Sequence, residues 1–96
     1  MDYKTFNPDE VFVDYNDRLW FYINARDEGL CQVCAKAAAE QHHVKYRSHG
    51  GKHKANEIIS LCKQHHYSEH NVRAKPSREY YNLINKAERR FRERMI

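Results

Sequence analysis

Two short metal-binding motifs, about 30 residues apart, constrain this chain more than any other feature. Cys-x-x-Cys occupies residues 31–34 and Cys-x-x-His occupies residues 62–65. A chain of 96 residues is expected to form one small domain, and such domains often depend on disulfides or a structural metal. Three cysteines cannot all pair, and seven histidines accompany them, so the composition favours metal binding in a reducing compartment. We therefore predict a closed tetrahedral zinc site, with the ligands Cys31, Cys34, Cys62 and His65.

A second group of histidines indicates another metal site. Side chains four apart on a helix share a face, whereas adjacent ones diverge by about 100°. His66 and His70 can therefore bind one ion while His65 points elsewhere. Whether residue 65 or residue 66 binds the zinc stays open, and helix geometry favours residue 65. The other candidates are His42 and His43. Adjacent strand residues point to opposite faces, so one of this pair can bind the ion while the other serves as a general base, since imidazole titrates near neutral pH.

Helical periodicity predicts a helix over residues 17–27, capped by Asn16 or Asp14 and ending near Gly29. Its buried side is expected to contain Leu19, Trp20 and Ile23. The cysteine motif follows, and residues 35–39 are helix-prone or form a connecting turn.

Strand character over residues 41–46 and 57–61 predicts a hairpin, with the Gly50-Gly51 pair in its long connection. A short helix holding His66 and His70 is expected next. A final helix, capped by Ser77, runs to about residue 95, and its apolar stripe is core or docking surface. The stripe consists of Tyr80, Ile84, Ala87, Phe91 and Met95.

Charge is distributed unevenly along the chain. Residues 1–30 carry a net charge of −4, residues 31–70 carry +3 and residues 71–96 carry +5. The basic centre and C-terminus predict a phosphate-binding surface, with a solvated helix face as the alternative for the tail. The candidate phosphate contacts are Arg47, Lys52, Lys54, Arg89 and Arg90. His49 and His53 are expected to lie on the surface.

The chain shows no sign of membrane association. Its acidic, polar N-terminus lacks the order of a signal peptide, and its longest apolar run, residues 19–23, is far too short to span a bilayer. We expect a soluble, cytoplasmic protein with no membrane partner.

The order Cys-x-x-Cys, His-His, Gly-Gly, Asn, Cys-x-x-His-His and a last His resembles the HNH endonucleases. The resemblance covers residues 26–70, nearly half of the chain. It implies an α+β fold with a small ββα-metal (His-Me finger) core, flanking N- and C-terminal helices and a structural zinc site. The expected organisation is a single nuclease domain over residues 1–96, with a basic C-terminal helix over residues 77–95.

The resemblance also implies a role for each residue of the motif. His42 would be a ligand of the catalytic metal and His43 the general base. His66 and His70 would complete a three-histidine site, and Asn56 would hold the loop against the backbone around His43. The predicted zinc ligands fall where many members place four cysteines, and histidine at position 65 departs from that pattern.

The implied activity is metal-dependent hydrolysis of DNA phosphodiester bonds, by nicking or double-strand cleavage. Three neutral imidazoles form a softer site than Mg²⁺ prefers, so Mn²⁺, Ni²⁺, Co²⁺ or Zn²⁺ are expected to support activity as well as Mg²⁺ or better. Small proteins resembling this family occur in phages and bacteria, which implies the cytoplasm of a bacterial or phage-infected cell and a packaging or recombination partner. The alternatives are a non-catalytic zinc-knuckle module that binds DNA or protein, and a structural or regulatory protein with vestigial histidines.

Overall fold

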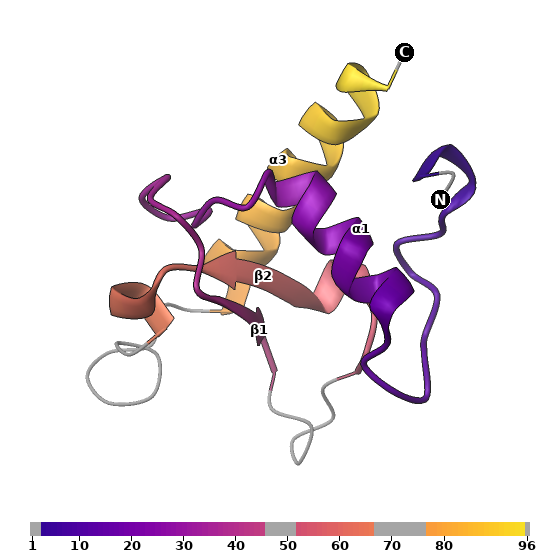
Figure 1. The fold of residues 1–96 in the computed structure, drawn as a ribbon, viewed down its shortest axis with the longest axis horizontal. Coiled ribbons are helices and arrows are strands. Elements are labelled where there is room, and N and C mark those ends of the chain that lie inside the picture. The colour runs from indigo at the N-terminus through magenta and orange to yellow at the C-terminus, as the bar shows by residue number, and fades with distance from the viewer. Residues whose placement is uncertain (1–2, 46–51, 67–76, 96) are drawn as a thin grey trace.

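The computed structural model describes residues 3–45, 52–66 and 77–95, and these form a mixed α+β fold (Figure 1). The elements follow the order η1 (Tyr3–Thr5), α1 (Asp17–Asp27), β1 (Glu40–His43), η3 (Ala55–Glu57), β2 (Ile58–Leu61) and α3 (Ser77–Arg94). A helical turn over residues 63–66 follows β2 directly. The α+β class expected from the sequence is confirmed at this level.

Helix α1 has the bounds that the sequence predicts. The side chain of Asn16 caps it by accepting a hydrogen bond of 3.0 Å from the backbone N–H of Leu19, which decides between the two candidate caps. The helix ends where Glu28 and Gly29 take left-handed backbone conformations, with φ of 58° and 67°. One expectation was wrong: Trp20 is 41% exposed, because the buried side of the helix turns toward Tyr22 and Arg26 instead.

The hairpin is antiparallel and short. Its register pairs Glu40 with Leu61 and His43 with Ile58. The first strand begins one residue earlier than expected and ends earlier, at His43, because Val44 and Lys45 form a bend. Tyr46 lies outside the described residues. The backbone N–H of Val44 still donates to the carbonyl of Glu57 at 2.8 Å, so the two chains remain together beyond the last strand residues.

Strand β2 is buried along its whole length and separates two groups of core residues. Ile58 packs on one side with Leu19, Ile23 and Phe91, and Ile59 packs on the other with Ile84. The second group also contains Cys31 and Cys62, so the cysteine motifs are part of the core. Burial of the α3 stripe is confirmed: its members are 0–6% exposed, apart from the partly buried Met95. Helix α3, at the C-terminal end of the chain, therefore packs against both β2 and α1 (Figure 1).

The N-terminal segment runs beside the hairpin without forming a strand of its own. Phe12 makes an isolated antiparallel bridge with His53, and its N–H donates to the His53 carbonyl at 2.8 Å. Across the described ranges, every helix is too short or too polar to cross a lipid bilayer.

Candidate functional site

The predicted zinc ligands come together from three parts of the chain. Cys31 and Cys34 lie in the loop after α1, Cys62 follows β2, and His65 stands on the next helical turn. All four ligand atoms lie within 4.8 Å of one another. The loop closes because Ala35 takes a left-handed conformation, with φ of 64°, and donates its N–H to the Cys31 carbonyl at 2.8 Å.

The spacing of these atoms fits a tetrahedral zinc ion. Zinc lies about 2.3 Å from sulfur and about 2.0 Å from nitrogen, which separates two sulfurs by about 3.8 Å and a sulfur from a nitrogen by about 3.5 Å. The sulfurs of Cys34 and Cys62 are 3.7 Å apart, and the Cys31 sulfur is 3.6 Å from Nδ1 of His65. The Cys62 sulfur lies closer to that nitrogen, at 3.1 Å. Three thiols and an imidazole at these distances are a donor set suited to zinc, and residue 65 rather than 66 completes it.

The local electrostatics favour metal binding at Cys62. The backbone N–H of His65 donates a hydrogen bond to the sulfur of Cys62. This bond and those with the side chains of His65 and Cys34 lower the pKa of the Cys62 thiol to about 6. The Lys36 N–H lowers the pKa of Cys34, but burial and the neighbouring sulfurs outweigh it, so that pKa is raised overall. Zinc binds thiolates, so Cys62 supplies the first of them near neutral pH and the other thiols lose their protons on binding.

Two of the three predicted ligands of the catalytic metal lie side by side. The rings of His42 and His66 are 5.5 Å apart between centroids and meet edge to face, at an interplanar angle of 72°. His42 is 6% exposed and also packs near Tyr80 of α3, with 6.3 Å between ring centroids. His70, the predicted third ligand, lies outside the described residues. His42 on β1 and His66 on the helical turn after β2 are thus brought together by the hairpin.

The predicted general base, His43, has a partner that the sequence did not indicate. Its Nε2 lies 3.0 Å from Nδ1 of His53, and the two ring centroids are 5.0 Å apart. The expectation that His53 lies on the surface was wrong: it is 8% exposed, because the bridge to Phe12 holds its backbone beneath the N-terminal segment. His49 lies outside the described residues.

Asn56 sits in η3, at the end of the hairpin connection. Its side-chain amide donates to Asp9 at 2.6 Å, and its backbone N–H donates to the carbonyl of Pro8 at 3.1 Å. Its Oδ1 is buried and has no hydrogen-bond partner among the described residues. The side chain therefore ties the connection to the N-terminal segment, whereas the backbone link beside His43 runs from Val44 to Glu57.

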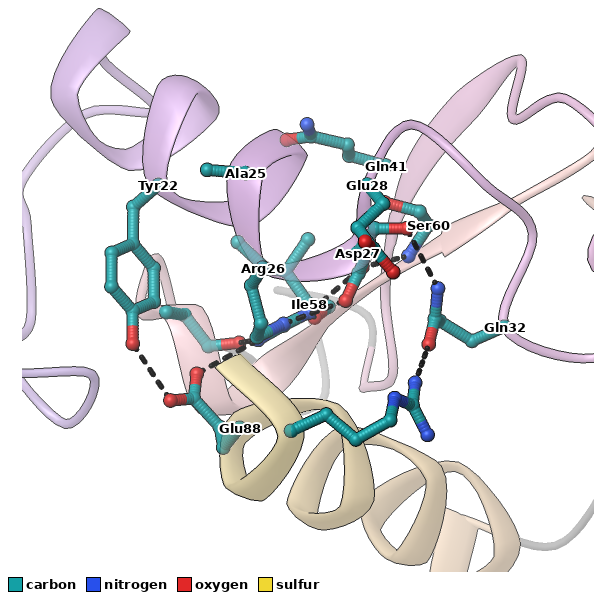
Figure 2. A network of polar contacts seen from close by, with 12 residues as sticks. Tyr22, Ala25, Arg26, Asp27, Glu28, Gln32, Gln41, Ile58, Ser60 and Glu88 are labelled. Carbon is teal, nitrogen blue, oxygen red and sulfur yellow. Dashed lines mark hydrogen bonds and ion pairs between the residues drawn. The ribbon is translucent and has the colours of Figure 1, made fainter. Parts of the chain in front are cut away.

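A buried ionic network centred on Arg26 contacts the backbone of this region (Figure 2). Arg26 is 1% exposed and donates five hydrogen bonds, two of them to the carbonyls of Ala55 and Ile58 at 2.7 Å. Its guanidinium also pairs with Asp27 at 2.8 Å and with Glu88 of α3 at 3.3 Å. The two carbonyls bracket η3, so Arg26 fixes the backbone on both sides of Asn56.

Sequence reasoning missed this network, although the spacing carried a signal. Arg26 follows Leu19 by seven and Ile23 by three, which places it on the buried side of α1. Glu88 follows Ile84 by four, at the edge of the apolar stripe of α3. Tyr22 completes the arrangement by donating its hydroxyl to Glu88 at 2.7 Å.

The predicted phosphate contacts that the structure describes come from two parts of the chain, the hairpin connection and α3. Lys52 and Arg89 are exposed. Lys54 lies 3.9 Å from the carboxylate of Glu57, and Arg90 donates to the side-chain carbonyl of Gln32 at 2.8 Å, beside the cysteine loop. Arg47 lies outside the described residues. The structure thus places exposed positive charge both near the hairpin and on α3.

Comparison with known proteins does not assign this chain to a family. No protein-family model matches the chain, and no curated protein matches its sequence. The resemblance to the HNH endonucleases therefore stays a prediction from the sequence motif.

Proposed function

We propose that this protein is a metal-dependent endonuclease that hydrolyses DNA phosphodiester bonds. The observation that carries the proposal is the contact between His42 and His66, made by a hairpin and the helical turn that follows it. Two imidazoles that share an ion, each with its nitrogen about 2 Å from the metal, have ring centres on the order of 5 Å apart. The observed 5.5 Å supports a shared ion.

The neighbouring residue supplies the proton chemistry. His43 follows His42 on β1 and points to the opposite face, so its ring can act while His42 binds metal. His43 removes a proton from water, and the resulting hydroxide attacks phosphorus in line with the departing 3′ oxygen. The products implied by the family resemblance are 5′-phosphate and 3′-hydroxyl ends. A divalent ion held by His42, His66 and His70 would stabilise the charge that develops on the phosphate oxygens and the leaving group.

The zinc cluster has a supporting part in this proposal. His65 belongs to the cluster and His66 is its immediate neighbour, so zinc binding fixes the turn that carries His66. On the other side of the hairpin, Asn56 donates to Asp9, and Arg26 donates to the carbonyls of Ala55 and Ile58. The exposed Lys52 and Arg89 are the proposed phosphate contacts.

Cleavage of supercoiled plasmid tests the proposal. The wild type and the variants His43→Ala and His43→Gln are compared in Mn²⁺, Ni²⁺, Co²⁺, Zn²⁺ and Mg²⁺, with zinc content and thermal unfolding measured on each protein. Loss of the general base is expected to slow cleavage by about 10²–10⁴-fold while leaving zinc content unchanged. Equal nicking by wild type and His43→Ala would exclude His43 as the base, and activity with Mg²⁺ alone would count against three-histidine ligation.

A second candidate is a non-catalytic zinc module that binds DNA or protein. It is favoured by one observation: within the described ranges, the one group of three or more metal-binding side chains whose ligand atoms converge is Cys31, Cys34, Cys62 and His65. This candidate predicts one tightly bound zinc and no nicking with any added metal, so the same plasmid assay separates the two.

A further inference from the structure

We infer that His53 is a positioning residue that holds His43 in the orientation and tautomer needed by a general base. The inference deepens the proposed function and rests on it. The two rings are 5.0 Å apart at an interplanar angle of 74°, and Nε2 of His43 lies 3.0 Å from Nδ1 of His53. That distance is normal for a hydrogen bond between two nitrogens, one of which carries the shared proton.

His53 is itself held in place. It is 8% exposed, and its backbone carbonyl accepts a hydrogen bond of 2.8 Å from the N–H of Phe12. Phe12 in turn stacks on Phe6, with 6.0 Å between ring centroids, and Phe6 belongs to the hydrophobic core. The imidazole of His53 is therefore attached to the core through the backbone, which is what a residue that orients another side chain requires.

The N-terminal segment also covers the pair. The ring of Tyr15 lies 5.9 Å from the ring of His43 and 6.2 Å from that of His53, measured between centroids. Its hydroxyl donates to the side-chain carbonyl of Gln41, which lies two residues before His43 on the same face of β1. Tyr15 thus closes one side of the imidazole pair and restricts both rings.

The position of the shared proton follows from the role of His43. A base must carry a lone pair, and a neutral imidazole has one protonated and one unprotonated nitrogen. When Nε2 of His43 donates to Nδ1 of His53, the lone pair of His43 resides on Nδ1. When the proton sits instead on Nδ1 of His53, His43 is forced into the opposite tautomer. The inference therefore requires His43 as donor and His53 as acceptor.

Two substitutions separate positioning from packing. His53→Leu fills a similar volume without an acceptor, whereas His53→Asn places an amide oxygen near the position of Nδ1 and can accept the same hydrogen bond. His53→Leu is expected to lower kcat for plasmid cleavage by about 10–100-fold with KM unchanged, and His53→Asn to recover most of that loss. Equal kcat in wild type and His53→Leu, or failure of His53→Asn to recover, overturns the inference.

A second measurement does not depend on cleavage. Long-range proton–nitrogen NMR correlations, recorded at a pH of about 8 where an ordinary imidazole is neutral, report which ring nitrogen carries the proton. We expect the proton of His43 on Nε2 in the wild type and in His53→Asn, and a mixture of tautomers in His53→Leu. A wild-type proton on Nδ1 overturns the inference. Absence of cleavage by the wild type in every metal would sink the proposed function, and this spectrum would still decide whether His53 sets the tautomer.

Discussion

Replacing Arg26 by methionine is expected to lower the free energy of unfolding by about 4 kcal/mol, because removal of one member of a buried ion pair leaves the other charge uncompensated. The side chains of Arg26 and Asp27 are both 0% exposed, and that of Glu88 is 9% exposed. Asp27 would keep a single described donor, the N–H of Ser60 at 3.0 Å. The carbonyls of Ala55 and Ile58 would each lose the donor that now lies 2.7 Å away.

This loss is large for so small a domain. At roughly 0.05–0.15 kcal/mol per residue, a chain of 96 residues has a stability of about 5–14 kcal/mol. With a urea m-value of about 1.5 kcal/mol/M, the unfolding midpoint would fall by roughly 2.7 M. Arg26→Lys keeps the positive charge but cannot reach two carbonyls and two carboxylates together, so we expect about half of the loss.

Urea unfolding of zinc-loaded protein, followed by circular dichroism, measures these differences. Arg92→Met, at an exposed position of α3, is the matched control and is expected to change stability by less than about 0.5 kcal/mol. Adding Glu88→Met to Arg26→Met removes one of the uncompensated carboxylates and should restore part of the loss. A loss below about 1 kcal/mol in Arg26→Met, or no recovery in the double variant, would refute the assignment of Arg26 as the support of the hairpin.

Three further predictions concern the metal sites and the basic surface. His65→Ala should lose zinc and thermal stability, whereas His66→Ala should keep both and lose plasmid cleavage. Metal analysis and thermal unfolding curves measure these changes. The reverse pattern would exchange the roles of the two residues. In zinc-free protein the lowered pKa of Cys62 stabilises the fold above the ordinary thiol pKa, and that contribution disappears as the pH falls through about 6. Protons compete with zinc for the same thiolate, so zinc release should increase as the pH falls through about 6. A metal indicator detects the released zinc. Zinc retention that is unchanged down to a pH of about 4 would contradict this prediction. Arg89→Ala should weaken binding to DNA of any sequence and reduce the salt dependence by about one phosphate contact, as measured by fluorescence anisotropy across a salt series; an unchanged slope would remove Arg89 from the interface.

The sequence predicted those parts of the fold that depend on a local periodicity or on a set of metal-binding residues. A tetrahedral zinc site needs four converging donors, so the sequence predicted that the motifs at residues 31–34 and 62–65 meet, and their ligand atoms do lie together. The stripe of α3 repeats at helical spacing, and its burial follows from that spacing. Alternation along β1 likewise separates His42 from His43.

The parts that the sequence did not predict depend on contacts between distant segments. Histidine and arginine are normally exposed. Helical spacing places Arg26 on the buried side of α1, but it does not indicate that Glu88 reaches it, and no local pattern indicates that Phe12 covers His53. Trp20 shows the reverse case, since its apolar character favoured burial while the buried side of α1 is formed by Leu19, Tyr22 and Ile23. In each case the deciding partner lies on another element.

The position of Glu88 in the chain has a consequence for synthesis. It lies 62 residues after Arg26 and follows both the cysteine motifs and the candidate histidine ligands. A nascent chain therefore carries these candidate ligands before it has the helix whose Glu88 pairs with Arg26. A chain released early would contain a complete set of thiols and imidazoles on an unsupported hairpin, able to capture metal but without the scaffold that orders it.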